Sequence, residues 1–183
     1  GAKAGHILLL PGYEIRPFAG ESPSPELVSA RLWALYNLLS GHHSLVAVTS
    51  APGALQLSLP KSALSRFVEI MEAGEEADRE ALVKYLVRSG YYSTTMVQSR
   101  GDFSVRGGIL DLYPPGAGRP VRAEFFGDYV ETIRSFRTLD QRSVNDLTEQ
   151  IILPANEIVY ESNNSEKAAS RLRDLSKKQG WLD

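Results

Sequence analysis

The sequence predicts two structural classes in one chain: an incomplete α/β layer, and an antiparallel β-rich module of the α+β class inserted into it. Three observations predict this arrangement. Two short apolar runs near the start are each followed by a helical signal, a long middle stretch alternates strand patterns with turn residues, and a helical pattern returns near the end. We therefore expect residues 1–63 and 154–183 to form the α/β part and residues 64–153 to form the β-rich module.

The first strand is predicted at residues 6–10, an apolar run that ends at the turn residues Pro11-Gly12. A short apolar run bounded by turn residues is typical of a buried strand in a parallel sheet. After the stretch Ser22-Pro-Ser-Pro25, apolar residues recur with the period of an amphipathic helix as far as Leu39. Gly41 then predicts the end of this helix, because glycine readily adopts the backbone conformation that closes helices.

A second strand and a second helix follow directly. Residues 45–48 form another apolar run, and Thr49-Ser-Ala-Pro52 combines a hydroxyl N-cap with an early proline, which together predict a helix start. The order strand, helix, strand, helix predicts an α/β layer. Two strands make a poor sheet, so we expect this layer to be incomplete and its missing partners to lie outside this fragment.

The β-rich module opens with a predicted helix at residues 78–88, which Gly90 is expected to end. Glycine, proline or aspartate turns then separate six predicted strands, at residues 91–98, 102–106, 109–113, 121–126, 129–137 and 146–153. Pro154-Ala-Asn-Glu157 ends the module. A helix that starts at Ser165 and reaches Leu175 then indicates a return to the first part.

Composition limits the classes of function. With 183 residues, 43% of them apolar, the chain is long enough for one medium or two small globular domains. Its 20 basic and 22 acidic residues leave a formal charge of -2, which excludes a global attraction to nucleic acid or acidic membranes. Any DNA contact would therefore have to be local.

The sequence has no cysteine, which excludes disulfides and thiolate-bound metals and favours a reducing, cytoplasmic location. No apolar run approaches membrane-spanning length, so we expect no membrane partner. The chain opens on Gly-Ala-Lys, without a methionine or a signal pattern, as we expect of an excised fragment.

No residue pattern indicates catalysis, and we expect no catalytic residue, no metal site and no cofactor. A helicase-type ATPase needs a glycine-rich phosphate loop with a lysine, and the sequence contains no Gly-Lys pair. His42 and His43 are adjacent in a predicted loop, so they lack the spacing of paired metal ligands on a helix, and His6 precedes a strand. A fold without the phosphate loop can bind partners, but it cannot position a phosphate for hydrolysis.

Arginines are concentrated in the β-rich module, where no lysine occurs between Lys84 and Lys167. An arginine-rich but nearly neutral surface suits directional pairing with carboxylates and carbonyls better than it suits the tracking of phosphates. The alternative is a solvated sheet face with local ion pairs. Composition alone does not decide between these two interpretations.

Side-chain alternation indicates which residues share a face of the predicted sheet. If the odd-numbered residues of strand 121–126 face the core, Arg122, Glu124 and Phe126 lie together on the other face. An exposed phenylalanine beside an arginine is typical of protein-binding hot spots. The alternative is that a helix or the first part of the chain covers Phe126 and makes it ordinary core.

The same alternation applies to the predicted strand at residues 102–106. Phe103 and Val105 would point inward, whereas Ser104 and Arg106 would point outward. This places Arg106 on what we expect to be the same surface as the residues of the neighbouring strand.

Six stretches carry a family resemblance. Four lie in the β-rich module and two lie upstream: Phe103–Pro115, Pro120–Asp128, Ile133–Phe136 and Gln141–Ser143, with Arg31–Leu35 and Val46–Ser50 before them. They resemble the transcription-repair coupling factor family, in the amino-terminal region that is similar to UvrB. The resemblance covers nearly the whole chain.

By this resemblance, residues 1–63 and 154–183 belong to a helicase-like first domain, and residues 64–153 form a second domain that docks on UvrA. The fragment would be non-catalytic and would recruit nucleotide excision repair to a stalled RNA polymerase. RNA polymerase and DNA would bind through other regions of the full-length protein, which the resemblance implies to be an ATP-dependent DNA translocase.

The resemblance also indicates docking residues. Arg106 occupies the Val-Arg-Gly position of the family, and Arg122 and Glu124 stand on the neighbouring strand as the family pattern has them. Two positions depart from the pattern, because Ser104 and Ser93 stand where arginines are expected. We expect these departures to make the affinity for UvrA weaker or differently anchored than in UvrB.

The alternative function is that of a nucleic-acid-binding fragment of an ATP-dependent DNA translocase. The near-neutral charge and the absence of lysine from the module argue against it. A salt-sensitive shift with DNA would support it.

Overall fold

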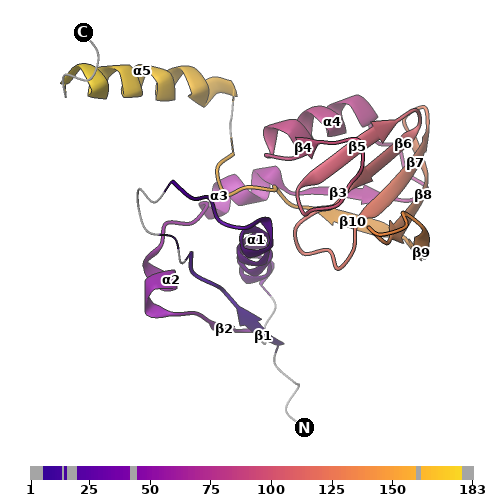
Figure 1. Ribbon diagram of the computed structural model, residues 1–183, viewed down its shortest axis with the longest axis horizontal. Helices are drawn as coiled ribbons and strands as arrows, with labels where there is room; N and C mark the ends of the chain where they lie inside the picture. The colour runs from indigo at the N-terminus through magenta and orange to yellow at the C-terminus, as the bar shows by residue number, and fades with distance from the viewer. Residues whose placement is uncertain (1–5, 14, 16–19, 42–44, 160–161, 179–183) are drawn as a thin grey trace.

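Three sheets organise the part of the chain that the structure describes (Figure 1). The computed structural model describes residues 6–13, 15, 20–41, 45–159 and 162–178, and within these ranges the fold is mixed α/β. A two-stranded parallel sheet lies near the N-terminus, and a six-stranded sheet with an adjoining two-stranded sheet follows. None of the helices in these ranges is both long enough and apolar enough to cross a membrane.

The parallel sheet has the predicted order of strand, helix, strand, helix. β1 (His6–Leu9) pairs in parallel with β2 (Leu45–Val48), and α1 (Pro25–Leu39) connects the two strands. α2 (Ala51–Leu55) follows β2. These four elements confirm the predictions for this part of the chain.

Local signals define the helix ends, and those at Ser50 and Gly41 act as predicted. The Ser24 hydroxyl accepts a hydrogen bond from the Leu27 amide at the start of α1, and the Ser50 hydroxyl accepts one from the Gly53 amide at the start of α2. Gly41 follows the end of α1 at a φ of 68°, where a side chain would be strained.

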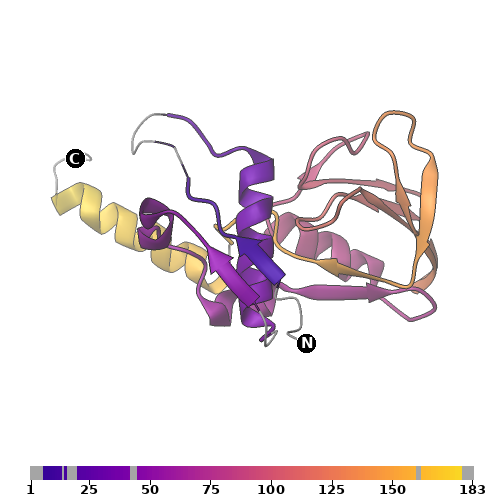
Figure 2. The ribbon, with the colours of Figure 1, turned by 90° about the horizontal axis from the view of Figure 1, so that it is seen from below.

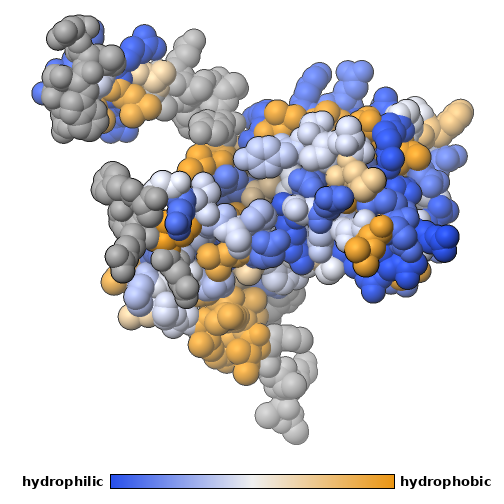
Figure 3. Space-filling model, viewed as in Figure 1, coloured by the Kyte–Doolittle hydropathy of each residue, from blue (hydrophilic) through white to orange (hydrophobic). Residues whose placement is uncertain are grey.

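The sheet of β1 and β2 presents an uncovered apolar surface. Ile7 is 78% exposed, and Leu9, Val46 and Val48 are also exposed. Figure 3 shows an apolar cluster on this side of the molecule. The predicted parallel pairing of β1 and β2 is confirmed. The predicted burial of the first strand is wrong among the described residues, because two strands and one helix cannot cover both faces of the sheet.

The β-rich module is built on a six-stranded sheet with the strand order β4-β5-β6-β7-β8-β9. Its strands are β4 (Tyr92–Ser93), β5 (Asp102–Arg106), β6 (Ile109–Leu112), β7 (Val121–Phe126), β8 (Tyr129–Phe136) and β9 (Ser143–Leu147). All neighbours are antiparallel except β4 and β5, which are parallel. The prediction of a purely antiparallel module is wrong at this edge.

The strand predicted at residues 91–98 is reduced to the two residues of β4. The chain turns after it because the Asp102 carboxylate accepts hydrogen bonds from the Gln98 and Ser99 amides, at 3.1 and 2.8 Å. A side chain that satisfies backbone donors in this way favours a turn over a strand.

A second, smaller sheet closes the module. β3 (Glu69–Glu72) pairs antiparallel with β10 (Glu149–Ile152). The strand predicted at residues 146–153 is split at Thr148, whose carbonyl accepts a hydrogen bond from the Ala73 amide. The chain thus leaves the large sheet after β9 and pairs with β3, a strand that the sequence did not predict.

One face of the six-stranded sheet carries the main hydrophobic core. α4 (Arg79–Arg88) lies within the helix predicted at residues 78–88, is capped by Asp78, and is followed by Gly90 at a φ of 86°. It contributes Leu86 to a core whose other buried members are Met71, Tyr91, Phe103, Leu110, Leu112, Val121, Ala123, Phe125, Val130, Ile133 and Ile152. We call the opposite face, which carries the partly exposed Arg122 and Glu124, the open face of the sheet.

The partly buried Tyr85 and the buried Tyr91 hold the entry and the exit of the module together. α3 (Lys61–Leu64) and a 3-10 helix lead into β3. The Tyr85 hydroxyl donates to the carbonyls of Phe67 and Ile152, and the Tyr91 hydroxyl donates to the Leu153 carbonyl at 2.6 Å. Burial raises the pKa of both phenols, so both remain protonated donors.

α1 joins the parallel sheet to the β-rich module (Figures 1 and 2). The Ser29 hydroxyl accepts a hydrogen bond from the Gly116 amide at 3.2 Å, and the Trp33 ring lies over the same glycine. A Cβ on Gly116 would lie 2.2 Å from the Trp33 ring, and the φ of Gly116 is 82°. Only glycine fits this contact without rearrangement.

A buried arginine ties four parts of the chain together. Arg31 on α1 is fully buried and pairs with Glu157, which follows the β-rich module, at 2.7 Å. Its guanidinium also donates to the Pro11 carbonyl at 2.6 Å and to the Ser58 hydroxyl at 3.0 Å, and it lies 4.5 Å from the centre of the Tyr13 ring. Segments before and after the inserted module therefore meet at one side chain.

α5 (Ser162–Lys178) lies apart from the other elements (Figures 1 and 3). The predicted helix at residues 165–175 is confirmed and is longer than predicted. The division of the chain at residues 63/64 and 153/154 stays a prediction.

We predict that Gly116→Ala lowers the free energy of unfolding by about 3 kcal/mol, because the added methyl group combines an unfavourable φ with a clash against the Trp33 ring. Gly118→Ala is the matched control, since a Cβ there would have no atom within 4 Å. Thermal and urea unfolding measure both effects. Equal stability of the two variants would contradict the contact between α1 and the module.

We predict that Arg31→Met lowers the free energy of unfolding by about 3 kcal/mol or more, because it leaves the Glu157 carboxylate without its cation in a site that is 10% exposed. Arg137→Met is the control, because it removes an arginine whose pair with Asp140 is exposed on both sides. Its melting temperature should be close to that of the unmodified chain. Similar losses in the two variants would show that burial of the pair is not decisive.

Candidate functional site

The open face of the six-stranded sheet carries the residues predicted to bind a partner. On β7, Val121, Ala123 and Phe125 are buried, which confirms the predicted alternation. Arg122 and Glu124 are partly exposed on the other face.

Phe126, the next residue on that face, is 78% exposed. The alternative that Phe126 is ordinary core is therefore wrong. It lies opposite Tyr129 at the end of the hairpin formed by β7 and β8.

The alternation predicted for β5 holds only in part. Phe103 is buried and Arg106 is exposed, as predicted. Ser104, however, is 2% exposed and Val105 is 41% exposed, which reverses the prediction for these two residues. Ser104 is covered because residues 94–99 turn over it, and its hydroxyl lies 3.5 Å from the Thr95 carbonyl oxygen.

A buried carboxylate joins the two predicted arginines. Asp111 on β6 is 1% exposed, and strand pairing places it between Ser104 and Arg122. Its Oδ1 accepts from Arg122 Nε at 2.7 Å, and its Oδ2 accepts from Arg122 Nη2 at 2.8 Å and from Arg106 Nη2 at 2.7 Å. The structure therefore brings Arg106 and Arg122 together on opposite sides of one acid.

Arg122 is mostly occupied by contacts within the chain. Its side chain is 17% exposed, and its Cζ lies 5.0 Å from the centre of the Phe136 ring. Its Nε and Nη2 both donate hydrogen bonds to Asp111. The hydrogen bonds to Asp111 raise the pKa of the Arg122 guanidinium, against the opposing effect of burial. Arg122 is thus a fixed cation rather than a fully exposed one.

Arg106 differs from Arg122 in its exposure. Its side chain is 53% exposed although one of its nitrogens contacts the buried Asp111. The remaining N–H groups of a guanidinium held at one nitrogen stay available to an acceptor outside the chain. Arg106 is therefore both oriented and accessible.

Glu124 belongs to a chain of ion pairs on the same face. Arg134 on β8 pairs with Glu124 at 3.3 Å and with Asp146 on β9 at 3.1 Å, and the Thr132 hydroxyl donates to Glu124 at 3.2 Å. All three charged side chains are at least one-third exposed, so each pair contributes at most about 1 kcal/mol. This part of the face fits the alternative of local ion pairs.

Sequence reasoning missed Asp111 and Arg31. Asp111 is the polar residue in the apolar strand pattern Ile109-Leu-Asp-Leu112, which was the available signal for a carboxylate that faces arginine on the side away from the core. Arg31 lies in an amphipathic helix, where arginine is ordinarily solvent-exposed. Its place on the apolar stripe, four residues after Leu27 and four before Leu35, was the available signal that it is buried.

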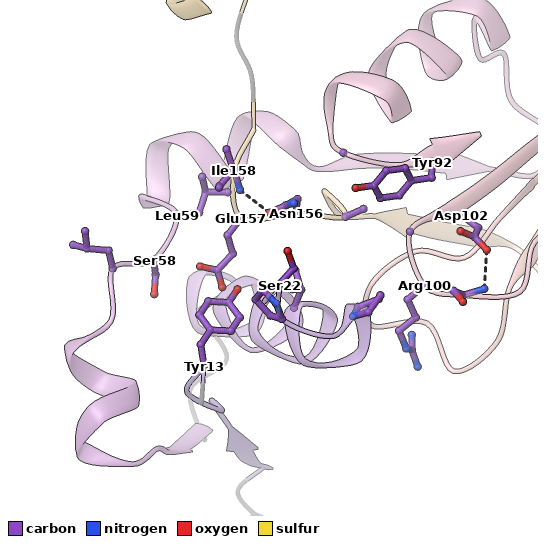
Figure 4. Close-up of a pocket in the computed structure, with 18 of the residues that line it drawn as sticks. Tyr13, Ser22, Ser58, Leu59, Tyr92, Arg100, Asp102, Asn156, Glu157 and Ile158 are labelled. Atoms are coloured by element: carbon purple, nitrogen blue, oxygen red, sulfur yellow. Dashed lines mark hydrogen bonds between the residues drawn. The ribbon is translucent and has the colours of Figure 1, made fainter. Parts of the chain in front are cut away.

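A cleft of about 760 Å³ lies where the parallel sheet part meets the β-rich module (Figure 4). The Tyr13 hydroxyl points toward Glu157 in this cleft, and burial together with Glu157 raises the pKa of Tyr13. Arg100 also lines the cleft, but it donates to the Ala117 carbonyl and stacks on Tyr113. Because these polar groups have partners within the chain, we interpret the cleft as a seam between the two parts.

The described residues contain no group of three or more histidine, aspartate or glutamate side chains that could hold a metal ion. His42 and His43, which the sequence places in a loop, lie outside the described residues. Ser93, one of the two expected arginine positions, is exposed on β4, whereas Ser104, the other, is buried.

Comparison with known proteins gives the chain a family context. The family model described as the UvrB interaction domain matches residues 70–158, which run from the second residue of β3 to beyond the end of β10. All four predicted docking residues fall within this match. Their role in binding stays a prediction.

The chain is also similar to transcription-repair-coupling factors from several bacteria. It is 35% identical over 173 residues to the protein of Myxococcus xanthus, and this alignment covers 94% of the chain and 14% of the relative. Identity is 34% over 167 residues to the protein of Bacillus subtilis (strain 168), covering 91% of the chain and 14% of the relative. Identity is 30% over 168 residues to the protein of Escherichia coli (strain K12), and this alignment covers 92% of the chain and 14% of the relative. The chain thus spans about one-seventh of these relatives.

Proposed function

The chain belongs to the transcription-repair-coupling factor family, as a segment that carries the UvrB interaction domain, and on that premise we propose that it is a non-catalytic docking module for UvrA. In the full-length protein, this docking recruits nucleotide excision repair to an RNA polymerase stalled at damage in the cytoplasm. RNA polymerase and DNA bind through other regions of that protein. α1, α2 and the β1–β2 sheet then represent part of a helicase-like layer that carries the module.

The exposed and oriented Arg106 is the observation that carries this proposal. An arginine side chain loses about 2 kcal/mol of rotamer entropy when it becomes ordered in a complex. The contact with Asp111 at 2.7 Å orders part of Arg106 before any partner arrives. Phe126 adds an exposed aromatic ring to the same face, and such arginine and aromatic pairs are common at the centres of protein interfaces.

The charges on this face favour a protein partner over nucleic acid. Asp111, Glu124 and Asp146 stand among the arginines, so the field at the surface is mixed rather than positive. Phosphate binding gains most from unpaired cations, because each cation that neutralises a phosphate releases a counterion from the nucleic acid. A mixed face instead matches the alternating charges of a protein surface.

We predict that Arg106→Ala weakens UvrA binding by on the order of 2 kcal/mol, about thirtyfold, and that Arg106→Glu weakens it further. A carboxylate at this position would repel the acceptors that the guanidinium contacts and would also face Asp111. Phe126→Ala should reduce affinity for a different reason, the loss of buried aromatic area. Titration calorimetry with purified UvrA measures the three variants.

Arg119→Ala is the matched control for these variants, because Arg119 is an exposed arginine of the same module outside the strands. It should bind UvrA as the unmodified chain does. Thermal melts exclude unfolding as the cause of any loss. Full affinity of both Arg106 variants would remove this face from the interface.

We also predict that ATP with magnesium leaves the melting temperature of the chain unchanged. A nucleotide bound at a hundredfold excess over its Kd would stabilise the fold by about 2.7 kcal/mol, which a thermal melt detects readily. Duplex DNA titrated at low and high salt tests the nucleic-acid alternative in the same format. A salt-sensitive stabilisation by DNA would favour that alternative over docking.

A further inference from the structure

We infer that Asp111 is a positioning residue for partner docking, with Arg122 as the anchor that fixes its carboxylate and Arg106 as the group that it presents. The inference rests on the proposed docking function. It assigns different tasks to two arginines that the sequence places together, and it adds a buried residue that does not itself reach the surface.

The Asp111 carboxylate accepts hydrogen bonds from two arginines. Arg122 makes two contacts, to Oδ1 and to Oδ2, which is the two-point geometry that fixes the plane of a carboxylate. Arg106 makes one contact, from Nη2 to Oδ2. Asp111 is therefore set by Arg122 and keeps a lone pair directed at Arg106.

Burial strengthens the contacts of Asp111. Asp111 is 1% exposed, so water does not compete for its oxygens, and the interaction with each arginine is stronger than between exposed side chains. The pair of Arg137 and Asp140 shows the contrast, because both of its side chains are well exposed. The anchor beneath Arg106 is thus more rigid than a surface ion pair.

Asp111 does not need Arg106 to neutralise its charge. Arg122 already supplies a full charge and two hydrogen bonds to the carboxylate. Arg106 remains 53% exposed, so its contact with Asp111 directs its other N–H groups outward. We therefore assign to Asp111 the task of orienting Arg106 for an acceptor on the partner.

Asp111→Asn tests this assignment with little change in side-chain shape. The amide presents a donor to one arginine and removes the charge, so Arg106 loses its fixed orientation. We expect binding to UvrA about tenfold weaker than that of the unmodified chain. In an Arg106→Ala background, the same substitution should cause little further loss, because the group that it orients is absent.

The double-mutant comparison separates positioning from general damage to the fold. A merely structural role of Asp111 would weaken binding by the same factor in both backgrounds. Equal losses would therefore overturn the inference, as would unchanged affinity of Asp111→Asn. If the unmodified chain does not bind UvrA at all, the docking function itself falls, which is a different and recognisable result.

Arg106→Lys is the second variant, and it leaves the buried pair of Asp111 and Arg122 intact. A lysine keeps the charge, but it lacks the planar guanidinium whose separate N–H groups can contact Asp111 and a partner at the same time. We expect this variant to lose nearly as much affinity as Arg106→Ala. Full affinity of Arg106→Lys would show that charge alone is sufficient and would overturn the inference.

Nitrogen-15 NMR of the arginine side chains measures the orientation without any partner. In the unmodified chain, the Nη2 group of Arg106, identified by its loss in Arg106→Ala, should rotate slowly about its bond to Cζ. In Asp111→Asn it should rotate quickly. Equal rotation rates would overturn the orienting contact whatever the binding measurements show.

Discussion

The buried ion pair of Arg31 and Glu157 is the interaction on which the arrangement of the chain depends. Its two residues are 126 positions apart, one before and one after the inserted module. Closing a loop of this length is unfavourable in entropy, although the penalty grows only slowly with length. The hydrogen bonds of Arg31 to Pro11 and Ser58 add two further segments to the same point. The contact of Gly116 with Ser29 and Trp33 fixes the orientation of the module from the other side of α1.

A second buried charge plays a corresponding part on the open face of the sheet. At the junction a buried cation collects acceptors, whereas at the docking face a buried anion, Asp111, collects cations. Burying such pairs contributes little net stability, because desolvation opposes the attraction. Their value lies in geometry, since each pair has few arrangements that satisfy all its hydrogen bonds. The fold and the proposed site thus both depend on a buried, hydrogen-bonded charge, which is a cation at Arg31 and an anion at Asp111.

The sequence predicted the elements whose apolar pattern is long and regular. β5, β7, α1 and α4 lie where periodicity and caps placed them, and Arg122, Glu124 and Phe126 share the predicted face. β3 was missed because only Met71 in its four residues is buried, which is too short a pattern to recognise. Ser104 was misplaced because its cover comes from a loop rather than from the strand pattern. Arg31 and Asp111 have partners on other elements, and a periodic pattern carries no information about those.

The positive charge of the open sheet face resides entirely on guanidinium groups, since no lysine occurs between Lys84 and Lys167. Reagents that attack primary amines, and enzymes that acetylate or ubiquitinate lysine, therefore have no target on Arg106, Arg122 or their neighbours on the sheet. Coupling the chain to an amine-reactive sensor surface attaches it through the α/β part, through α4 or through its ends. Such coupling leaves the arginines of this face unmodified.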